Sequence, residues 1–196
     1  MRVSMKKNLL ALSLVATTML AVTGPALAEE SIGLDVNFTA NIRETTCDMK
    51  LVGGTGSDTQ QTLTIGNNGQ VRLDDVKTGT ANATFKIVIV ECPASLKSLK
   101  TQVSGQRSGY LYTGLTNQIP KASGGADYAA VEIARADSPD APFLVNATDD
   151  TGKLIWTTAE IQNKEVPLVA TMRETQENKM TIGDFQALAT FNFEYE

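Results

Sequence analysis

The chain of 196 residues contains no histidine. This absence excludes Ser-His and Cys-His catalytic pairs, and it also excludes metal sites built on imidazole ligands. The glycine-rich run at 53–56 lacks the lysine that follows the glycines of a phosphate-binding loop. The acidic pairs Asp74-Asp75 and Asp149-Asp150 lack the spacing of a calcium loop, so we interpret them as solvated turns. The sequence therefore predicts no enzyme, no metal site and no cofactor.

The first residues have the pattern of a secretory leader. Basic residues between 2 and 7 precede an apolar stretch from Leu9 to Val22, and Ala26-Leu27-Ala28 supplies a cleavage site. The alternative, an uncleaved membrane anchor, is weaker because the apolar stretch is shorter than the roughly 20 residues that span a bilayer. We predict a signal peptide at residues 1–28 and a mature chain that begins near Glu29.

The mature chain is expected to be acidic. Removing the leader takes away three basic residues and no acidic ones, which changes the formal charge from −5 to −8. An acidic surface argues against nucleic acid and anionic lipid as partners. The 168 residues that remain are enough for one domain with a sizeable core.

Cysteine is scarce, with Cys47 and Cys92 the two present. In an exported chain an even pair favours a disulfide over a metal site, and the alternative is two buried free thiols. We expect the bond to tie the first strand of the domain to a later one.

Short strand signals, separated by turn residues, fill the middle of the chain. No stretch with helical periodicity is longer than a turn or two. The predicted strands cover residues 62–65, 83–92, 100–103, 128–134, 143–145, 154–156 and 166–172. In the second of these, Phe85, Ile87 and Ile89 share one face. This spacing favours an antiparallel β-sandwich.

The C-terminal segment alternates between apolar and polar residues, with Leu188 the one apolar exception on its polar face. Its apolar face comprises Phe185, Ala187, Ala189, Phe191, Phe193 and Tyr195. Such alternation predicts a strand with one buried face. A strand of this kind at a sheet edge is normally covered or paired, or it accepts a strand from another chain.

A second alternating segment follows the leader. Its apolar face comprises Ile32, Leu34, Val36, Phe38, Ala40 and Ile42. It is about 35 Å long if extended, roughly twice the usual strand length. It is either a long first strand of the domain or an arm that lies in another molecule.

Together these features resemble a fimbrial subunit (pilin) of the chaperone–usher pathway. The resemblance covers the leader, the alternating arm, Cys47 just after it, the strand Phe85–Cys92, and the segment Gly183–Tyr195 with its penultimate tyrosine. It implies an all-β fold, an incomplete immunoglobulin-like β-sandwich that lacks its final strand and is completed by a donor strand. The domains implied are the signal peptide at 1–28, an N-terminal donor-strand extension at 29–42 and a pilin domain at 43–196.

The resemblance also implies roles for particular residues. Ile32, Leu34, Val36 and Phe38 would be the donor-strand side chains inserted into a neighbour. Phe185, Ala187, Ala189, Phe191, Phe193 and Tyr195 would line the groove on the acceptor strand, and the carboxylate of Glu196 would bind basic residues of the chaperone. One departure from the family is Gly33, which falls on the opposite phase to Leu34 and Val36, where the family commonly has a glycine in phase.

The predicted function is therefore that of a structural subunit of a surface fimbria that serves cell adhesion. It would polymerise by donor-strand exchange with other pilin subunits, after a periplasmic chaperone delivers it to an outer-membrane usher. The chain would be exported through the periplasm to the fimbrium on the cell surface. The alternatives are a short adhesive or adaptor tip subunit, which would have a host receptor, and an exported β-sandwich ligand-binding module.

Overall fold

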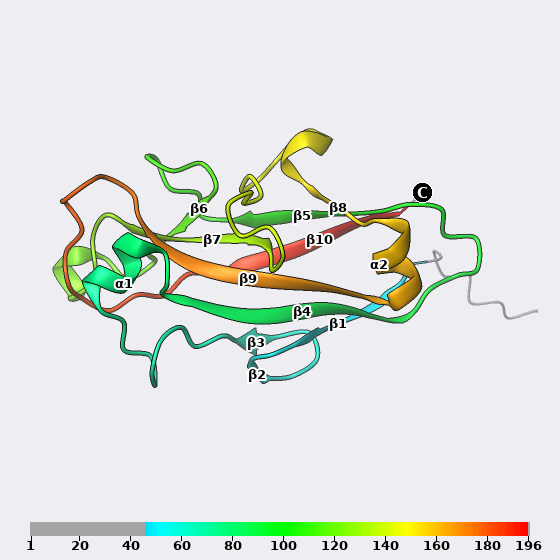
Figure 1. Ribbon diagram of the computed structural model, residues 1–196, viewed down its shortest axis with the longest axis horizontal. Coiled ribbons are helices and arrows are strands. Elements are labelled where there is room, and N and C mark those ends of the chain that lie inside the picture. The colour runs from blue at the N-terminus through cyan, green and yellow to red at the C-terminus, as the bar shows by residue number, and fades with distance from the viewer. Residues whose placement is uncertain (1–45, 196) are drawn as a thin grey trace, which may run out of the picture. The chain divides into compact units, whose positions relative to one another are not determined.

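Two antiparallel sheets form the domain (Figure 1). The computed structural model describes residues 46–195, so the predicted signal peptide at 1–28, the extension at 29–42 and Glu196 lie outside the described residues. The first sheet has the order β1 (Asp48–Val52), β4 (Asn82–Glu91), β9 (Glu165–Glu174), β7 (Ala129–Arg135) and β6 (Gly114–Thr116). The second has the order β10 (Ala189–Tyr195), β5 (Leu99–Gly105) and β8 (Leu154–Ile155). A two-residue ribbon, β2 (Thr55–Gly56) with β3 (Gln61–Thr62), follows β1.

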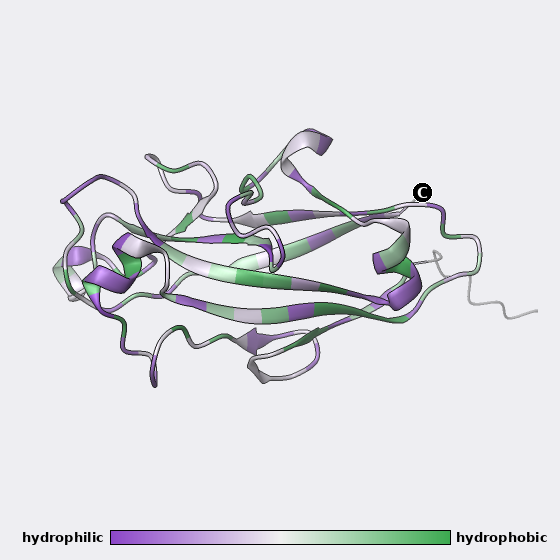
Figure 2. Cartoon of the chain, viewed as in Figure 1, coloured by the Kyte–Doolittle hydropathy of each residue, from purple (hydrophilic) through white to green (hydrophobic). Residues whose placement is uncertain are grey.

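The inward faces of the two sheets make one hydrophobic core. Its buried side chains come from strands of both sheets and from the segments just before and after β8: Ile87, Ile89, Leu99, Val103, Leu115, Ile133, Phe143, Val145, Leu154, Trp156, Val166 and Leu168. Along β4 the fully buried side chains are Ile87 and Ile89, which share one face, and Figure 2 shows the apolar stretch of this strand in green. The indole N–H of Trp156 is satisfied inside this core, where Nε1 donates to Oγ1 of Thr101 at 2.9 Å. The sandwich class predicted from the sequence is confirmed.

The helices are short. α1 (Leu73–Thr78) and α2 (Thr158–Asn163) have six residues each, and the 3₁₀ turns η1 (Lys121–Ser123) and η2 (Asp150–Gly152) have three. α2 begins with a capping box in which Thr157 and Glu160 satisfy each other's backbone N–H groups. No helix within residues 46–195 is long and apolar enough to cross a membrane.

An ion pair joins α2 to the first sheet. Nε and Nη2 of Arg135 in β7 donate to the two carboxylate oxygens of Glu160, each at 2.9 Å. Burial alone would raise the pKa of Glu160, but the hydrogen bonds from Arg135 and Thr157 outweigh it, so the pKa lies below its ordinary value. The pair is partly buried and bidentate, which makes it stronger than an exposed ion pair.

Most of the predicted strands are present, with three corrections. Residues 143–145 do not form a strand: Phe143 N donates to Ile133 O, whereas Val145 N donates to Tyr112 O, so the segment bridges separate elements instead of extending one ladder. The strand predicted at 62–65 ends at Thr62. The last strand begins at Ala189 and not at Phe185, because Asp184 forms a parallel bridge with Gly125 before the chain reaches β5. Three strands, β1, β2 and β6, were not predicted.

Candidate functional site

One edge strand of each sheet matters for the site: β1 in the first sheet and β10 in the second. Each has one strand neighbour among the described residues. β1 pairs with β4 alone, and β10 pairs with β5 alone over seven residue pairs from Ala189↔Gly105 to Tyr195↔Leu99. The backbone N–H and C=O groups on the other edge of β10 therefore have no ladder partner among residues 46–195. An edge of this kind can pair with an added strand.

Two contacts place the edge strands beside each other and set their directions. Oη of Tyr195, at the end of β10, donates to the carbonyl of Cys47, just before β1, at 3.4 Å. The ring centroids of Phe191 and Phe85 are 5.9 Å apart. Phe85 lies one position before Lys86, the β4 residue that pairs with Val52 at the end of β1. β10 therefore runs towards the start of β1, and the two edge strands are antiparallel to each other.

The start of β1 is also held by a disulfide. Cys47 bonds Cys92, immediately after β4, with the two Cα atoms 4.3 Å apart. The predicted bridge between the first strand and a later one is thus confirmed. At the same place, burial raises the pKa of Tyr195, which keeps its hydroxyl protonated as a hydrogen-bond donor.

Between these edges the core is covered only in part. The side chains there are half-buried and pack against the buried core, and we call them the open strip: Met49, Leu51, Phe85, Ala187, Ala189, Phe191, Phe193 and Tyr195. The intervening residues of β10, Thr190, Asn192 and Glu194, are exposed. A row of half-buried apolar side chains beside an unpaired strand edge offers pockets for the alternate residues of one additional strand.

The open strip contains five of the six apolar residues predicted on the C-terminal segment. The sixth, Phe185, packs against a second cluster around Val76 and Met172, near α1. Sequence reasoning missed Met49 and Leu51 on β1. A signal was present, because Cys47, Met49 and Leu51 alternate with charged residues at period two.

The donor-strand residues predicted from the sequence cannot be placed on this site. Ile32, Leu34, Val36 and Phe38 lie outside the described residues, as does Glu196. Among residues 46–195 there is also no group of three or more acidic or cysteine side chains arranged to hold a metal ion.

Comparison with known proteins agrees with this geometry. The model of the "Fimbrial protein" family matches residues 36–196. The chain belongs to the fimbrial protein family. This is a family of structural proteins and not of enzymes, and membership places the chain among the subunits of surface pili.

Individual members of the fimbrial family support the assignment. An uncharacterized fimbrial-like protein, YadM of Escherichia coli K12, is 29% identical over 167 residues, which cover 83% of this chain and 87% of YadM. The crystal structure of the P pilus rod subunit PapA superposes with a TM-score of 0.51 at 17% identity, covering 83% of this chain and all of PapA. The PapA match shows a shared fold, the immunoglobulin-like pilin sandwich.

Proposed function

We propose that this fimbrial subunit polymerises by donor-strand exchange and that the open strip is the acceptor site. The observation that carries the proposal is the combination of an unpaired β10 edge with half-buried side chains on both sides of it. An extended segment can pair its backbone with β10 while its alternate side chains cover Phe191 and Phe193 on one flank and Leu51 on the other.

The strand directions favour a segment from another copy of the chain. A strand that extends this antiparallel sheet must run opposite to β10, away from Tyr195. The chain's own extension enters the domain at Cys47, beside Tyr195, so an extension folded back along the strip would run in the same direction as β10. Parallel pairing is slightly weaker per residue than antiparallel pairing. A strand from another copy can complete the sheet in the antiparallel sense without reversing its direction, which is why we propose another copy as the donor.

The extension at 29–42 is the proposed donor. Four of its apolar residues, Ile32, Leu34, Val36 and Phe38, alternate as the strip requires. Burying four such side chains contributes about 6–12 kcal/mol before the cost of ordering the segment and immobilising the partners. A contact between the extension of one copy and the strip of the next does not close on itself, so repetition produces a filament.

The same strip would have to be protected before assembly. We propose that a periplasmic chaperone fills it first and that the fimbrial usher in the outer membrane exchanges the chaperone strand for a subunit extension. Glu196, which follows β10 directly, would place its carboxylates near basic residues of the chaperone. This order of events requires export through the periplasm, in agreement with the leader pattern at residues 1–28.

Deletion of residues 29–38 tests the proposal. The shortened subunit should bind the chaperone normally but form no filaments, as measured by electron microscopy and by sedimentation of assembled material. A matched pair of point variants sharpens the test: Val36→Asp, on the apolar face of the extension, should block assembly, whereas Asn37→Asp, on its polar face, should not. Filaments of wild-type length from the deletion variant would disprove the donor assignment.

A further inference from the structure

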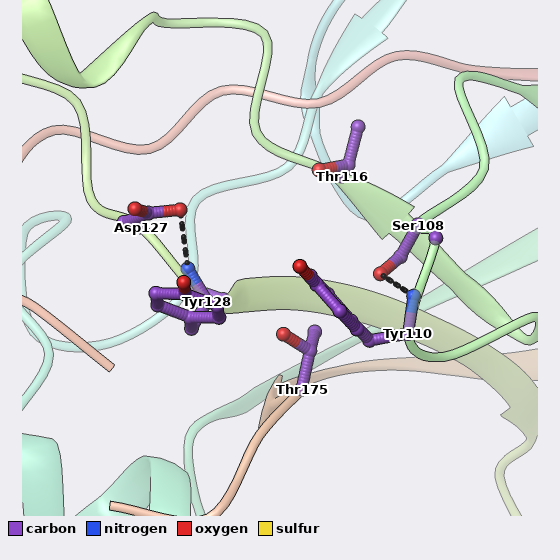
Figure 3. Close-up of a pocket in the computed structure, with 8 residues that line it drawn as sticks. Ser108, Tyr110, Thr116, Asp127, Tyr128 and Thr175 are labelled. Atoms are coloured by element: carbon purple, nitrogen blue, oxygen red, sulfur yellow. Dashed lines mark hydrogen bonds between the residues drawn. The ribbon is translucent and has the colours of Figure 1, made fainter. Parts of the chain in front are cut away.

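A pocket separate from the open strip lies where the loop after β5 meets the start of β7 (Figure 3). Its lining includes Ser108, Tyr110, Thr116, Asp127, Tyr128 and Thr175. None of these residues belongs to the open strip, and polymerisation through that strip leaves the pocket without a role. The pocket is formed entirely by residues that the structure describes.

Two tyrosine rings dominate the pocket. The ring centroids of Tyr110 and Tyr128 are 5.8 Å apart with the planes tilted by 39°. Figure 3 shows the Tyr110 ring among Thr116, Ser108 and Thr175, and the Tyr128 ring beside Asp127. Tyr110 is 62% exposed, so its ring offers apolar surface to a ligand. Exposed aromatic faces in a polar pocket are typical of recognition sites, because the ring supplies contact area with little conformational freedom to lose.

The backbone of Tyr128 is held in a conformation that residues with side chains rarely adopt. Its φ is +56°, in the left-handed region. Tyr128 N donates to Oδ1 of Asp127 at 3.0 Å, and Tyr128 O accepts from Thr175 N at 2.8 Å. Asp127 N in turn donates to Oγ1 of Thr181 at 2.9 Å. Strained residues fixed by their surroundings cluster at binding sites, so this turn sets the ring of Tyr128 in place before any ligand arrives.

The polar atoms of the pocket are available to a ligand. Within residues 46–195, the side-chain hydroxyls of Tyr110, Tyr128, Thr116 and Thr175 make no hydrogen bond to another protein group. The second carboxylate oxygen of Asp127 has one long contact, 3.5 Å to Nζ of Lys121. Four hydroxyls and a carboxylate around two rings match a ligand that offers many hydroxyls and an apolar C–H face.

We infer that this pocket binds a neutral pyranose, stacked on Tyr110 and hydrogen-bonded through its hydroxyls to Asp127 and Thr175. The ring face carries negative charge density that attracts polarised C–H groups, while the carboxylate accepts hydrogen bonds from adjacent sugar hydroxyls. Asp127 is the one acidic side chain that lines the pocket, and it would repel the carboxylate of an anionic sugar, whereas Lys121 and Lys179 lie at the pocket's margin. This binding goes beyond a structural role, since it would let the fimbrial subunit itself hold a glycan surface.

Saturation-transfer NMR on the exported full chain, as fibres or as soluble complexes, tests this inference. The sugars are the methyl glycosides of mannose, galactose and N-acetylglucosamine, with N-acetylneuraminic acid as the anionic comparison. We expect transfer to the C–H groups of one face of at least one neutral glycoside. No transfer to any neutral glycoside, or transfer to N-acetylneuraminic acid alone, would overturn the inference.

Two tyrosines of equal exposure provide the matched control. Tyr112 is 60% exposed and lies outside the pocket, where the guanidinium of Arg107 covers its ring at 4.6 Å. Tyr110→Ala should weaken sugar binding at least tenfold, and Tyr112→Ala should leave it unchanged. Thr175→Val, which removes one hydroxyl but keeps the backbone bond to Tyr128, should weaken binding severalfold. Equal loss in the two tyrosine variants would refute the pocket, and fibre assembly in all three is the check that the fold is intact.

Discussion

The substitution Phe191→Asp probes the open strip most sharply. Phe191 is half-buried in the isolated domain, contacts the ring of Phe85 across the two sheets, and would be covered fully by an added strand. Truncating a buried phenylalanine forfeits about 1.5–3 kcal/mol of apolar burial, and placing a carboxylate in the same site costs several kcal/mol more. A loss of at least about 4 kcal/mol in the free energy of strand binding, roughly a thousandfold in affinity, is expected.

The neighbouring residue supplies the control. Thr190 lies on the same strand, next in sequence, with its side chain exposed on the opposite face. Thr190→Asp adds the same charge without entering the strip, so it should leave strand binding unchanged. The assay is co-purification of each variant with a tagged chaperone from the periplasm, followed by titration with a peptide of residues 29–42. Equal yields and equal peptide affinities for the two variants would refute the assignment of the strip as the acceptor site.

Three further substitutions test the supports of the fold, each by urea unfolding of the strand-filled domain. Cys47→Ser, which breaks the bond to Cys92 across a separation of 45 residues, should lower the unfolding free energy by about 4 kcal/mol; an unchanged midpoint would remove the bridge from the account. Thr101→Val leaves the buried indole N–H of Trp156 unpaired and should cost about 1–3 kcal/mol, whereas a neutral result would indicate another acceptor. Glu160→Gln removes a carboxylate whose pKa in the folded chain is lowered, so it should reduce the unfolding free energy by about 1–2 kcal/mol at neutral pH. This difference should vanish as the pH falls through the folded pKa, because the wild-type carboxylate is then protonated. A difference independent of pH would contradict the ion-pair explanation.

The sequence predicted those elements whose own pattern determines them. Phe85, Ile87 and Ile89 recur at every second position of β4, as Phe191 and Phe193 do in the C-terminal segment, and the structure buries Ile87 and Ile89 fully and Phe191 in part. The disulfide followed from a pair of cysteines in an exported chain. These predictions required no information about which segments of the chain pair or pack with one another.

What the sequence left undetermined depends on tertiary contacts. β6 has three residues, too few for a periodic pattern, and exists because it pairs with β7. Residues 143–145 are apolar like a buried strand, but their hydrogen bonds go to two different elements. Phe185 continues the alternation of β10 although the bridge at Asp184 directs it to another cluster. The pocket around Tyr110 and Tyr128 assembles from distant segments and has no sequence signature.

The measurement that tests the central proposal most directly is the stability of residues 43–196 alone and with a peptide of residues 29–42. If the open strip is an incomplete core, urea unfolding of the domain alone should show little cooperativity, and adding the peptide should produce a cooperative transition whose midpoint rises with peptide concentration. A cooperative transition at the same midpoint with and without the peptide would contradict the proposal that this fimbrial subunit borrows a strand to complete its core.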